Sequence, residues 1–318
     1  MIDAISRRTF LRRSGAGVSA LAASGIVPAQ AASAMPMRTL GKTGLKVSML
    51  AFGGGSQFLL AKDGAWEPML ERAIAAGINL FDTSSGYQWK ASKSSEERFG
   101  EVLPRYRKAI YVSTKLEERE YDKARKEFER SLQRMKMDYV DLLLIHSIEP
   151  NEDLAALEKG VYRAISALKQ EKSVRFIGFS SMDSAAKSKE LLERLDVDAA
   201  ILAMNATQYG DFAKVALPAA RAKNVGIVAM KLMRGIVGKT ATASEAFYYA
   251  WTQPGVASAV VGHVGMSPLE ENMRIALAYS PEKAEAFDRR GLEARLRDFA
   301  GPHALCWARP DYRDGAYA

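Results

Sequence analysis

Short apolar runs alternate with longer amphipathic stretches along most of the chain. Fully apolar runs are typical of strands buried on both faces, and apolar residues at helical spacing are typical of helices that cover them. The first strand is expected to end within 51–55, followed by strands at 79–81, 109–113, 140–145, 175–179, 199–204, 226–230 and 257–261. Helices are expected at 66–76, 95–103, 122–136, 153–170, 183–194, 211–223, 243–251 and 268–278.

Eight strands, each followed by a helix, predict an α/β fold with a parallel sheet closed into a (β/α)8 TIM barrel. The segments 37–40 and 45–47 flank a Gly-Lys-Thr-Gly turn, which predicts a hairpin before the barrel. A further helix is expected at 281–299 and an irregular tail at 300–318. We therefore expect one domain over 32–318, with its core at 37–278 and a C-terminal extension at 279–318.

The first residues are typical of an export signal. The run Ser6-Arg7-Arg8-Thr9-Phe10-Leu11-Arg12 matches the twin-arginine pattern, and an uncharged, mildly apolar stretch follows it. Ala29-Gln30-Ala31 is a small-x-small cleavage site. We expect a signal peptide over 1–31, cleaved near Ala31, that brings the folded protein to the twin-arginine machinery and into the periplasm without a permanent membrane anchor. The alternative is a frayed cytosolic N-terminus.

Composition excludes several other classes of protein. Of the net charge of +8, +3 lies within the first 31 residues, and the rest follows no long basic run, so we expect no nucleic-acid partner. The single cysteine, Cys306, excludes an intrachain disulfide framework and a multi-cysteine metal site within this chain. With three histidines in all, we predict no metal site.

Polar residues follow three consecutive predicted strands. Asp82 and Tyr87 come after the second strand, Lys115 ends the third and His146 ends the fourth. The carboxyl ends of the strands form the mouth of such a barrel, so these side chains are expected to meet. A structural ion pair and a satisfied core histidine are the alternative interpretation of the same residues.

This set of side chains suits the reduction of a carbonyl group. A phenol has a pKa of about 10, and a nearby ammonium makes it a better proton donor. A carboxylate holds that ammonium, and a histidine polarises the carbonyl oxygen. None of these groups donates a hydride, so a cofactor must supply it.

Motifs along the chain then resemble the aldo-keto reductase family. They are Met37 to Ser48, Phe52-Gly53-Gly54, Phe81-Asp82-Thr83-Ser84-Ser85-Gly86-Tyr87, Ser113-Thr114-Lys115, Asp141 to His146, Ile177 to Ser181, Met204-Asn205, Lys231-Leu232-Met233-Arg234-Gly235 and Glu270-Glu271-Asn272. The resemblance implies an NAD(P)H-dependent reductase of aldehydes or ketones. It also implies a catalytic tetrad of Asp82, Tyr87, Lys115 and His146, with Tyr87 as general acid in reduction and base in oxidation.

The same resemblance implies a set of cofactor-binding residues. These are Gly53, Ser180, Ser181, Asn205, Lys231, Leu232, Arg234, Gly235, Glu271 and Asn272. Met230 stands where relatives stack a tyrosine, and Gly262 and Pro268 stand where many relatives read a 2′-phosphate with basic residues. The choice between NADP(H) and NAD(H) therefore stays open. Trp89 is assigned either to the wall of the substrate pocket or to the barrel rim.

Three functions remain open at this stage. The first is an exported oxidoreductase for a small carbonyl substrate, which needs a tightly held cofactor or a redox partner outside the inner membrane. The second is a non-catalytic dinucleotide-binding sensor or binding protein on the same barrel. The third is a Schiff-base lyase that uses Lys115 or Lys231, although Asp82 would keep Lys115 protonated.

Overall fold

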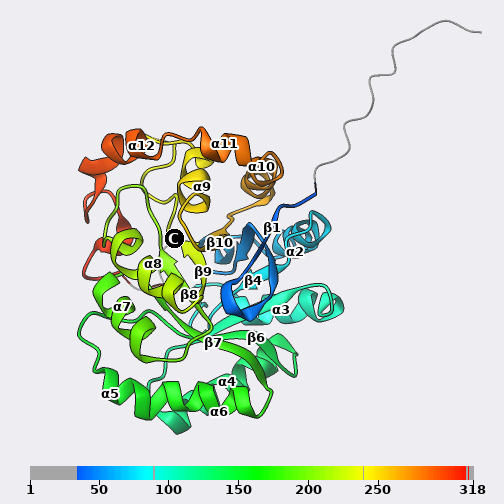
Figure 1. The fold of residues 1–318 in the computed structure, drawn as a ribbon. Coiled ribbons are helices and arrows are strands. Elements are labelled where there is room, and N and C mark those ends of the chain that lie inside the picture. Colours follow the sequence, from blue (N-terminus) through cyan, green and yellow to red (C-terminus); the bar gives the residue numbers. More distant parts are fainter. Residues whose placement is uncertain (1–33, 89, 239, 313, 315–318) are drawn as a thin grey trace, which may run out of the picture. The chain divides into compact units, whose positions relative to one another are not determined.

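Eight parallel strands close into a barrel in the computed structural model, which describes residues 34–314 except 89, 239 and 313 (Figure 1). Around the barrel the order is β10-β3-β4-β5-β6-β7-β8-β9. The strands are β3 (Leu50–Gly53), β4 (Leu80–Asp82), β5 (Tyr111–Leu116), β6 (Val140–Ile145), β7 (Val174–Ser181), β8 (Ala199–Ala203), β9 (Gly226–Met230) and β10 (Val256–Gly262). The predicted signal peptide and Trp89 lie outside the described residues.

Helices follow the strands in turn and form the outer layer. They are α2 (Trp66–Ala75), α3 (Ser95–Val102), α4 (Tyr121–Met135), α6 (Arg163–Gln170), α7 (Ala185–Arg194), α8 (Phe212–Ala222), α9 (Ala243–Trp251) and α10 (Met266–Leu277). The predicted (β/α)8 barrel is confirmed, because each buried strand is covered by the helices that the amphipathic pattern indicated.

Two predicted helices are interrupted. The helix expected at 153–170 consists of α5 (Leu154–Leu157), a π-helical turn (Glu158–Tyr162) and α6. At Gly160 a Cβ atom would lie 2.2 Å from the carbonyl oxygen of Arg119, so the chain deviates where the two backbones meet. The helix expected at 281–299 consists of α11 (Pro281–Glu285), α12 (Arg289–Leu296) and a 3₁₀ turn (Arg297–Phe299). Asp288 separates them by accepting a 2.9 Å hydrogen bond from the Gly291 N–H as the N-cap of α12.

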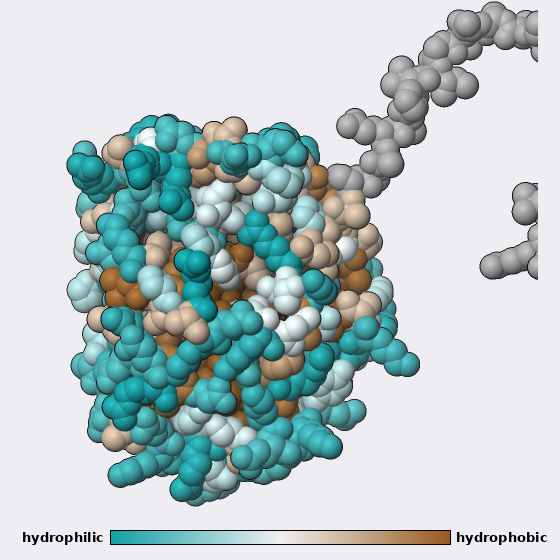
Figure 2. All heavy atoms as spheres, in the orientation of Figure 1, coloured by the Kyte–Doolittle hydropathy of each residue, from teal (hydrophilic) through white to brown (hydrophobic). Residues whose placement is uncertain are grey.

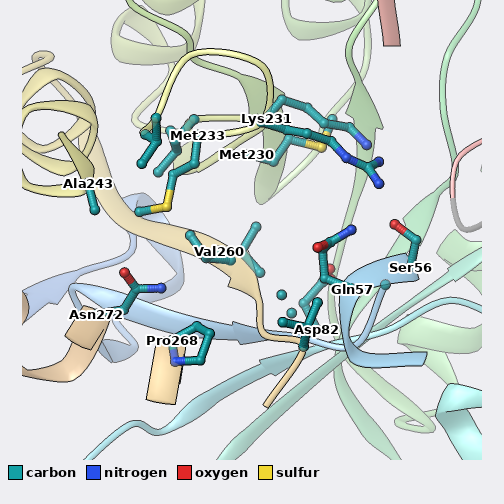
Figure 3. Close-up of a pocket in the computed structure, with 18 of the residues that line it drawn as sticks. Ser56, Gln57, Asp82, Met230, Lys231, Met233, Ala243, Val260, Pro268 and Asn272 are labelled. Atoms are coloured by element: carbon teal, nitrogen blue, oxygen red, sulfur yellow. The ribbon is translucent and has the colours of Figure 1, made fainter. Parts of the chain in front are cut away.

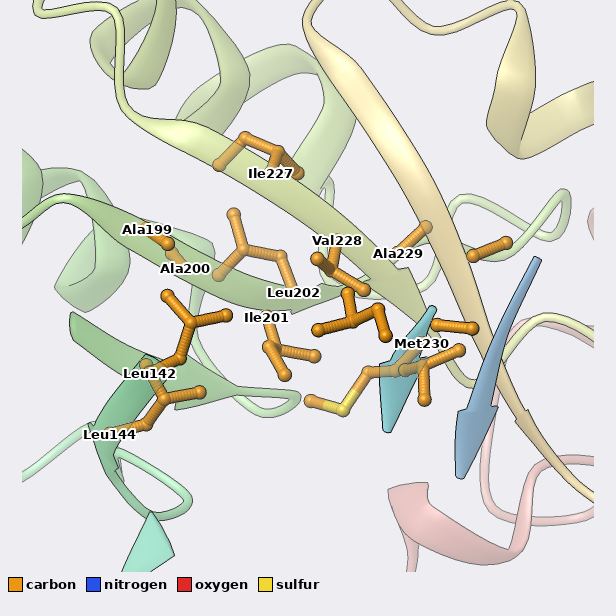
Figure 4. Packing of buried hydrophobic residues seen from close by; sticks show 14 of the residues in the cluster. Leu142, Leu144, Ala199, Ala200, Ile201, Leu202, Ile227, Val228, Ala229 and Met230 are labelled. Carbon is orange, nitrogen blue, oxygen red and sulfur yellow. The ribbon is translucent and has the colours of Figure 1, made fainter. Parts of the chain in front are cut away.

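The core lies inside the barrel and between the barrel and its helices. Every residue of β6, β8 and β9 is buried, which explains why their sequences are apolar apart from Asp141 in β6. Leu142 and Leu144 of β6, Ile201 and Leu202 of β8 and Val228 of β9 belong to one buried hydrophobic cluster (Figure 4). Since strands buried on both faces offer no polar side, the polar residues of the barrel gather at its two ends.

The hairpin lies at the amino end of the barrel. Strands β1 (Met37–Thr39) and β2 (Lys46–Ser48) pair antiparallel, as expected from the turn between them. Arg38 donates 2.9 Å to the carbonyl of Val256, where β10 begins, and the Lys42 N–H donates 2.6 Å to the carbonyl of Asn224, just before β9. Because the hairpin covers this end, the carboxyl ends of the strands form the accessible mouth.

The face of the protein in Figure 2 is mostly hydrophilic, with hydrophobic atoms visible between the polar ones. In the part of the chain that the structure describes, every helix is too short or too polar to cross a bilayer.

Candidate active site

The strand ends bring the predicted tetrad together. Asp82 is the last residue of β4, Lys115 lies near the end of β5, and His146 directly follows β6. Asp82 pairs with Ser113 and Lys115 with Leu144 in the parallel register, so the three ends lie at the same level of the barrel. Tyr87 reaches the same place from the loop between β4 and α3.

Asp82 and Lys115 form a buried ion pair. Lys115 Nζ lies 2.6 Å from Asp82 Oδ2 and donates 2.7 Å to the Thr83 carbonyl oxygen. The ammonium lies 5.0 Å from the centre of the Tyr87 ring. Its charge is therefore fixed beside the phenol. The ion pair and the hydrogen bond to Thr83 occupy the amine, which opposes its use as a nucleophile.

Tyr87 and His146 face each other across the mouth. The Tyr87 hydroxyl lies 3.5 Å from His146 Nε2, and the two rings meet edge to face with their centres 5.4 Å apart. Both side chains are buried. A carbonyl oxygen placed between these two groups would meet two hydrogen-bonding side chains at once.

Glu117 and Ser84 hold the other side of the His146 ring. Nδ1 forms a short hydrogen bond with Glu117 Oε1 and lies 3.1 Å from Ser84 Oγ, which also donates to Glu117. These partners were missed in the sequence. Glu117 comes two residues after Lys115 at the same strand end, so the rule that identified Lys115 would also have found it.

A carboxylate from the far end of the described chain occupies the mouth. Asp314 Oδ2 accepts 2.6 Å from the Tyr87 hydroxyl and lies 3.2 Å from His146 Nε2. Its other oxygen forms an ion pair with Lys231 and accepts 3.0 Å from the Tyr312 hydroxyl. This contact was not predicted, since an isolated aspartate in an irregular segment carries no periodic pattern.

Burial and this carboxylate set the pKa values of the mouth. Burial, followed by the negative charges of Asp314 and Asp82, raises the pKa of the Tyr87 phenol well above its ordinary value. The expectation that Lys115 makes this phenol more acidic is therefore wrong for the state with Asp314 in place. The main physical reason is burial; in addition, Asp82 offsets the ammonium and Asp314 accepts a hydrogen bond from the phenol.

The pKa of His146 is also raised, although burial acts on it in the opposite direction. Burial lowers its pKa, but hydrogen bonds to Asp314 and Glu117 outweigh burial and raise the pKa above 6.5. Burial also raises the pKa of Asp314, but the charge of Lys231 and the hydrogen bond from His146 hold it well below its ordinary range. The contacts thus favour an imidazolium beside a carboxylate.

A cavity of about 420 Å³ extends from the tetrad along the ends of β9 and β10 (Figure 3). This volume lies within the usual range of small-molecule sites. Its lining includes Asp82, Tyr87 and Lys115 at one end and Met230, Met233 and Val260 along an apolar wall. Predicted cofactor residues that line it are Gly53, Lys231, Leu232, Arg234, Gly235, Glu271 and Asn272.

Three predicted cofactor residues lie outside that lining and use their polar atoms within the protein. Ser180 Oγ accepts 2.9 Å from the Ser147 N–H, and Ser181 Oγ donates 3.4 Å to the Ile148 carbonyl. Asn205 Nδ2 donates 2.9 Å to the carbonyl of Lys231, and its side-chain oxygen accepts from the Thr207 N–H. Asn205 thus holds the backbone that follows β9.

The cavity fits an elongated polar cofactor with flat rings. Asp82 Oδ1 is buried without a hydrogen-bond partner among the described atoms, and Asp82 lines the cavity, so a bound hydroxyl donor would satisfy it. The first turn of α10 carries no side-chain cap, and its Pro268 lines the cavity. Such a helix start, together with Arg234, is suited to phosphate groups. Among the described residues, no cluster of three or more His, Cys, Asp or Glu side chains is arranged to hold a metal ion.

Comparison with known proteins identifies the family. The model of the Aldo/keto reductase family matches residues 61–247. The chain belongs to the aldo/keto reductase family. Members of this family are oxidoreductases that generally use NAD(P)H, and the closed barrel described above is the fold of this family.

Relatives of this aldo/keto reductase cover different shares of it. It is 36% identical over 156 residues to L-galactose dehydrogenase of Arabidopsis thaliana, which covers 46% of the chain and 48% of that relative. It is 32% identical over 161 residues to 6-dehydroglucose reductase of Novosphingobium aromaticivorans, covering 45% of the chain and 51% of that relative. The chain thus matches about half the length of such curated relatives.

Solved structures match more of the barrel. A protein from Pseudomonas aeruginosa assigned as an aldo-keto reductase superposes with a TM-score of 0.64 at 28% identity, covering 77% of this chain and 97% of that chain. The holo form of an aldo-keto reductase from Bacillus halodurans superposes with a TM-score of 0.66 over 84% of this chain and 96% of that chain. At 19% identity, this second likeness concerns the fold alone.

Proposed function

We propose that the protein reduces an aldehyde or ketone to an alcohol with NAD(P)H. The observation that carries this proposal is the convergence of Asp82, Tyr87 and Lys115 at one end of the 420 Å³ cavity, with His146 Nε2 3.5 Å from the Tyr87 hydroxyl. When bound, the reduced nicotinamide supplies the hydride that the carbonyl carbon accepts.

The residues of the chain divide the remaining work. Tyr87 donates the proton that the carbonyl oxygen takes, and His146 orients that oxygen from 3.5 Å away from the phenol. Lys115 lies beside the phenol and stabilises negative charge that develops there, while Asp82 keeps the ammonium in place. In this proposal a substrate takes the position of Asp314, because both use the Tyr87 hydroxyl.

The apolar wall and the polar residues of the cavity support the cofactor assignment. Arg234 and the start of α10 suit the pyrophosphate, and Asn272 and Glu271 suit the base and ribose at the other end. We propose no preference between NADPH and NADH, so both are used in the test.

The test follows the absorbance of NADPH or NADH in the presence of an aromatic aldehyde. Tyr87→Phe is expected to lower kcat by at least about 100-fold, since a positioned general acid contributes about 10²–10⁴-fold. Tyr106→Phe, in a 3₁₀ turn outside the cavity, is the matched control and should keep full activity. Undiminished turnover in Tyr87→Phe would contradict the proposed role.

A second candidate, a dinucleotide-binding sensor without turnover, is favoured by one observation. Asp314 occupies the place of the carbonyl oxygen and raises the pKa of Tyr87. Tight binding of NADPH or NADH without turnover of a broad panel of carbonyl compounds would favour this function over the reductase.

We propose, from the sequence alone, that the protein is exported folded by the twin-arginine machinery and acts in the periplasm. Reduced cofactor must then travel with the protein or be regenerated by a redox partner. Replacing Arg7 and Arg8 by lysine should retain the precursor in the cytoplasm, as detected by fractionation and blotting. Unchanged delivery of this variant would contradict export by this route.

A further inference from the structure

One carboxylate bridges two separate parts of the mouth. Asp314 Oδ2 lies within hydrogen-bond distance of the Tyr87 hydroxyl and of His146 Nε2, and Asp314 Oδ1 forms an ion pair with Lys231 Nζ. Lys231 also donates 2.8 Å to the Tyr312 hydroxyl, and only 15% of its side chain is exposed. The site thus places a buried ammonium next to the pair of groups assigned to the reacting carbonyl.

We propose that Tyr87, His146 and Lys231 form a subsite for a 2-oxo acid, a substrate with a carboxylate on the carbon next to its carbonyl. Asp314 holds the place of that substrate when the substrate is absent. This inference rests on the proposed function, because it names the substrate class of the same site.

The shape of a 2-oxo acid matches what Asp314 presents. Its keto oxygen and one carboxylate oxygen lie side by side on adjacent carbons, much as the two oxygens of Asp314 lie side by side on one carbon. The keto oxygen takes the place of Oδ2 at Tyr87 and His146, and the carboxylate takes the place of Oδ1 at Lys231. The keto carbon gains the hydride of the reduced nicotinamide, which is oxidised, and the keto oxygen takes the Tyr87 proton. The product is a 2-hydroxy acid whose carboxylate still pairs with Lys231.

Charge favours an anionic substrate over a neutral one. If a neutral carbonyl compound displaces Asp314, the mostly buried Lys231 ammonium loses its carboxylate, which is unfavourable. A 2-oxo acid replaces one carboxylate with another. The carboxylate of Asp183 acts on Lys231 only at longer range, whereas Asp314 forms the ion pair with it.

The backbone at Lys231 is held in an uncommon conformation. Lys231 has a φ of 60°, in the left-handed region that side-chain-bearing residues rarely adopt. The Asn205 amide donates 2.9 Å to the Lys231 carbonyl and 3.3 Å to the Leu232 carbonyl, which supports this turn. Such strain gathers at functional sites, where it fixes the direction of a side chain. Asn205 is thus a positioning residue for Lys231.

The experiment compares phenylglyoxylate with its methyl ester, which carries the same ketone without the negative charge. It uses the full-length Asp314→Ala protein, with and without Lys231→Met. In Asp314→Ala the acid should have the lower KM. Adding Lys231→Met should raise KM for the acid by at least about tenfold and change KM for the ester by less than about twofold.

Two further variants guard against a merely structural effect. Lys231→Arg keeps the positive charge and should restore most of the preference for the acid. Lys214→Met removes an exposed lysine on α8 and should leave KM unchanged for both the acid and the ester. Equal increases in KM for the acid and the ester on adding Lys231→Met would overturn the inference. A lower KM for the ester than for the acid in Asp314→Ala would also overturn it.

Direct binding separates this inference from the proposed function. Calorimetric titration of phenylglyoxylate into Asp314→Ala should give a dissociation constant that Lys231→Met weakens by about tenfold, with or without catalysis. If no carbonyl compound is turned over but this binding persists, the reductase proposal fails and the carboxylate subsite stands. If the ester is reduced in a Tyr87-dependent way and the acid neither binds nor reacts, the subsite fails alone.

Discussion

The Tyr87 hydroxyl donates a 2.6 Å hydrogen bond to Asp314 Oδ2, joining residues that are 227 positions apart in the sequence. The group assigned as proton donor is therefore bonded to a carboxylate of its own chain. Burial and the negative charge of Asp314 together hold the phenol pKa well above its ordinary value. Removal of this carboxylate is the most direct way to change the chemistry of the mouth.

Replacing Asp314 with alanine should increase activity toward a neutral aldehyde. The apparent affinity of a site falls with the fraction of molecules that can accept the ligand, and the carboxylate lowers that fraction. We expect kcat/KM for benzaldehyde to rise about tenfold, measured by nicotinamide absorbance. Asp298→Ala, which removes an exposed carboxylate in the 3₁₀ turn after α12, is the control. A fall in kcat/KM would instead assign Asp314 to the catalytic machinery.

Replacing Glu117 with glutamine should shift the pH profile. Although burial lowers the His146 pKa, Asp314 and Glu117 raise it overall, so the loss of one negative charge lowers it. Activity that needs the imidazolium is present below the His146 pKa and is lost as pH rises through it. This loss should therefore occur at a lower pH in Glu117→Gln than in the wild-type protein.

The pH dependence of kcat/KM checks this expectation. Glu120→Gln, an exposed residue that pairs with Lys123, serves as control and should leave the profile unchanged. An identical profile in Glu117→Gln would show that Glu117 does not stabilise the charged ring.

His263 should make the fold sensitive to mild acid. Both of its ring nitrogens are buried without a partner among the described atoms, and burial lowers its pKa from 6.5 to about 4. Between pH 6.5 and about 4, His263 binds a proton in the unfolded chain but stays neutral in the folded chain. Stability is thus lost as pH falls from about 6.5 to 4, by roughly 3 kcal/mol from this residue.

Urea unfolding at pH 7 and pH 4 measures this effect as a difference between the wild-type protein and His263→Phe. His146 contributes with the opposite sign in both proteins, because its pKa is raised, and its contribution cancels in the comparison. His303→Gln removes an exposed histidine and should behave as the wild type. The same pH dependence in His263→Phe would exclude His263 as the acid-sensitive group.

Asp141 should be important for the stability of the folded protein and not for catalysis. Its buried carboxylate lies 2.7 Å from both Arg107 and Arg175 and accepts 2.9 Å from the Val112 N–H. Asp141→Ala leaves these groups uncompensated and should lower the free energy of unfolding by about 3–5 kcal/mol. Asp196→Ala removes an exposed partner of Lys42 and should cost less than about 1 kcal/mol. Similar unfolding midpoints for both variants would contradict this difference.

The sequence was sufficient for the barrel because each strand and helix carries its own periodic pattern. Val140–Ile145 and Gly226–Met230 were predicted to the residue, since both are mostly apolar and end where a polar residue follows, His146 and Lys231. The convergence of Asp82, Lys115 and His146 followed from the rule that parallel strands share one carboxyl edge. The Gly160 deviation could not be predicted, because it depends on a backbone from another element.

The parts of the site that the sequence did not predict depend on long-range contacts. Asp314 and Tyr312 lie in a segment without periodicity, and their partners are fixed only by the folded barrel. The raised pKa of Tyr87 follows first from burial and then from the contact with Asp314. Asn205 was assigned to the cofactor by resemblance, whereas in the structure its amide bonds to the Lys231 and Leu232 carbonyls.

The bond between Asp314 and the mouth has a kinetic consequence, since the competing group is covalently attached. Dilution of the protein leaves the fraction of molecules with Asp314 in the mouth unchanged, whereas dilution would release a free inhibitor. At saturating substrate, the approach to full turnover should become limited by the rate at which Asp314 leaves the mouth of the barrel. A stopped-flow trace of the wild-type protein would then show a lag whose length no longer depends on substrate concentration, and Asp314→Ala would start without one.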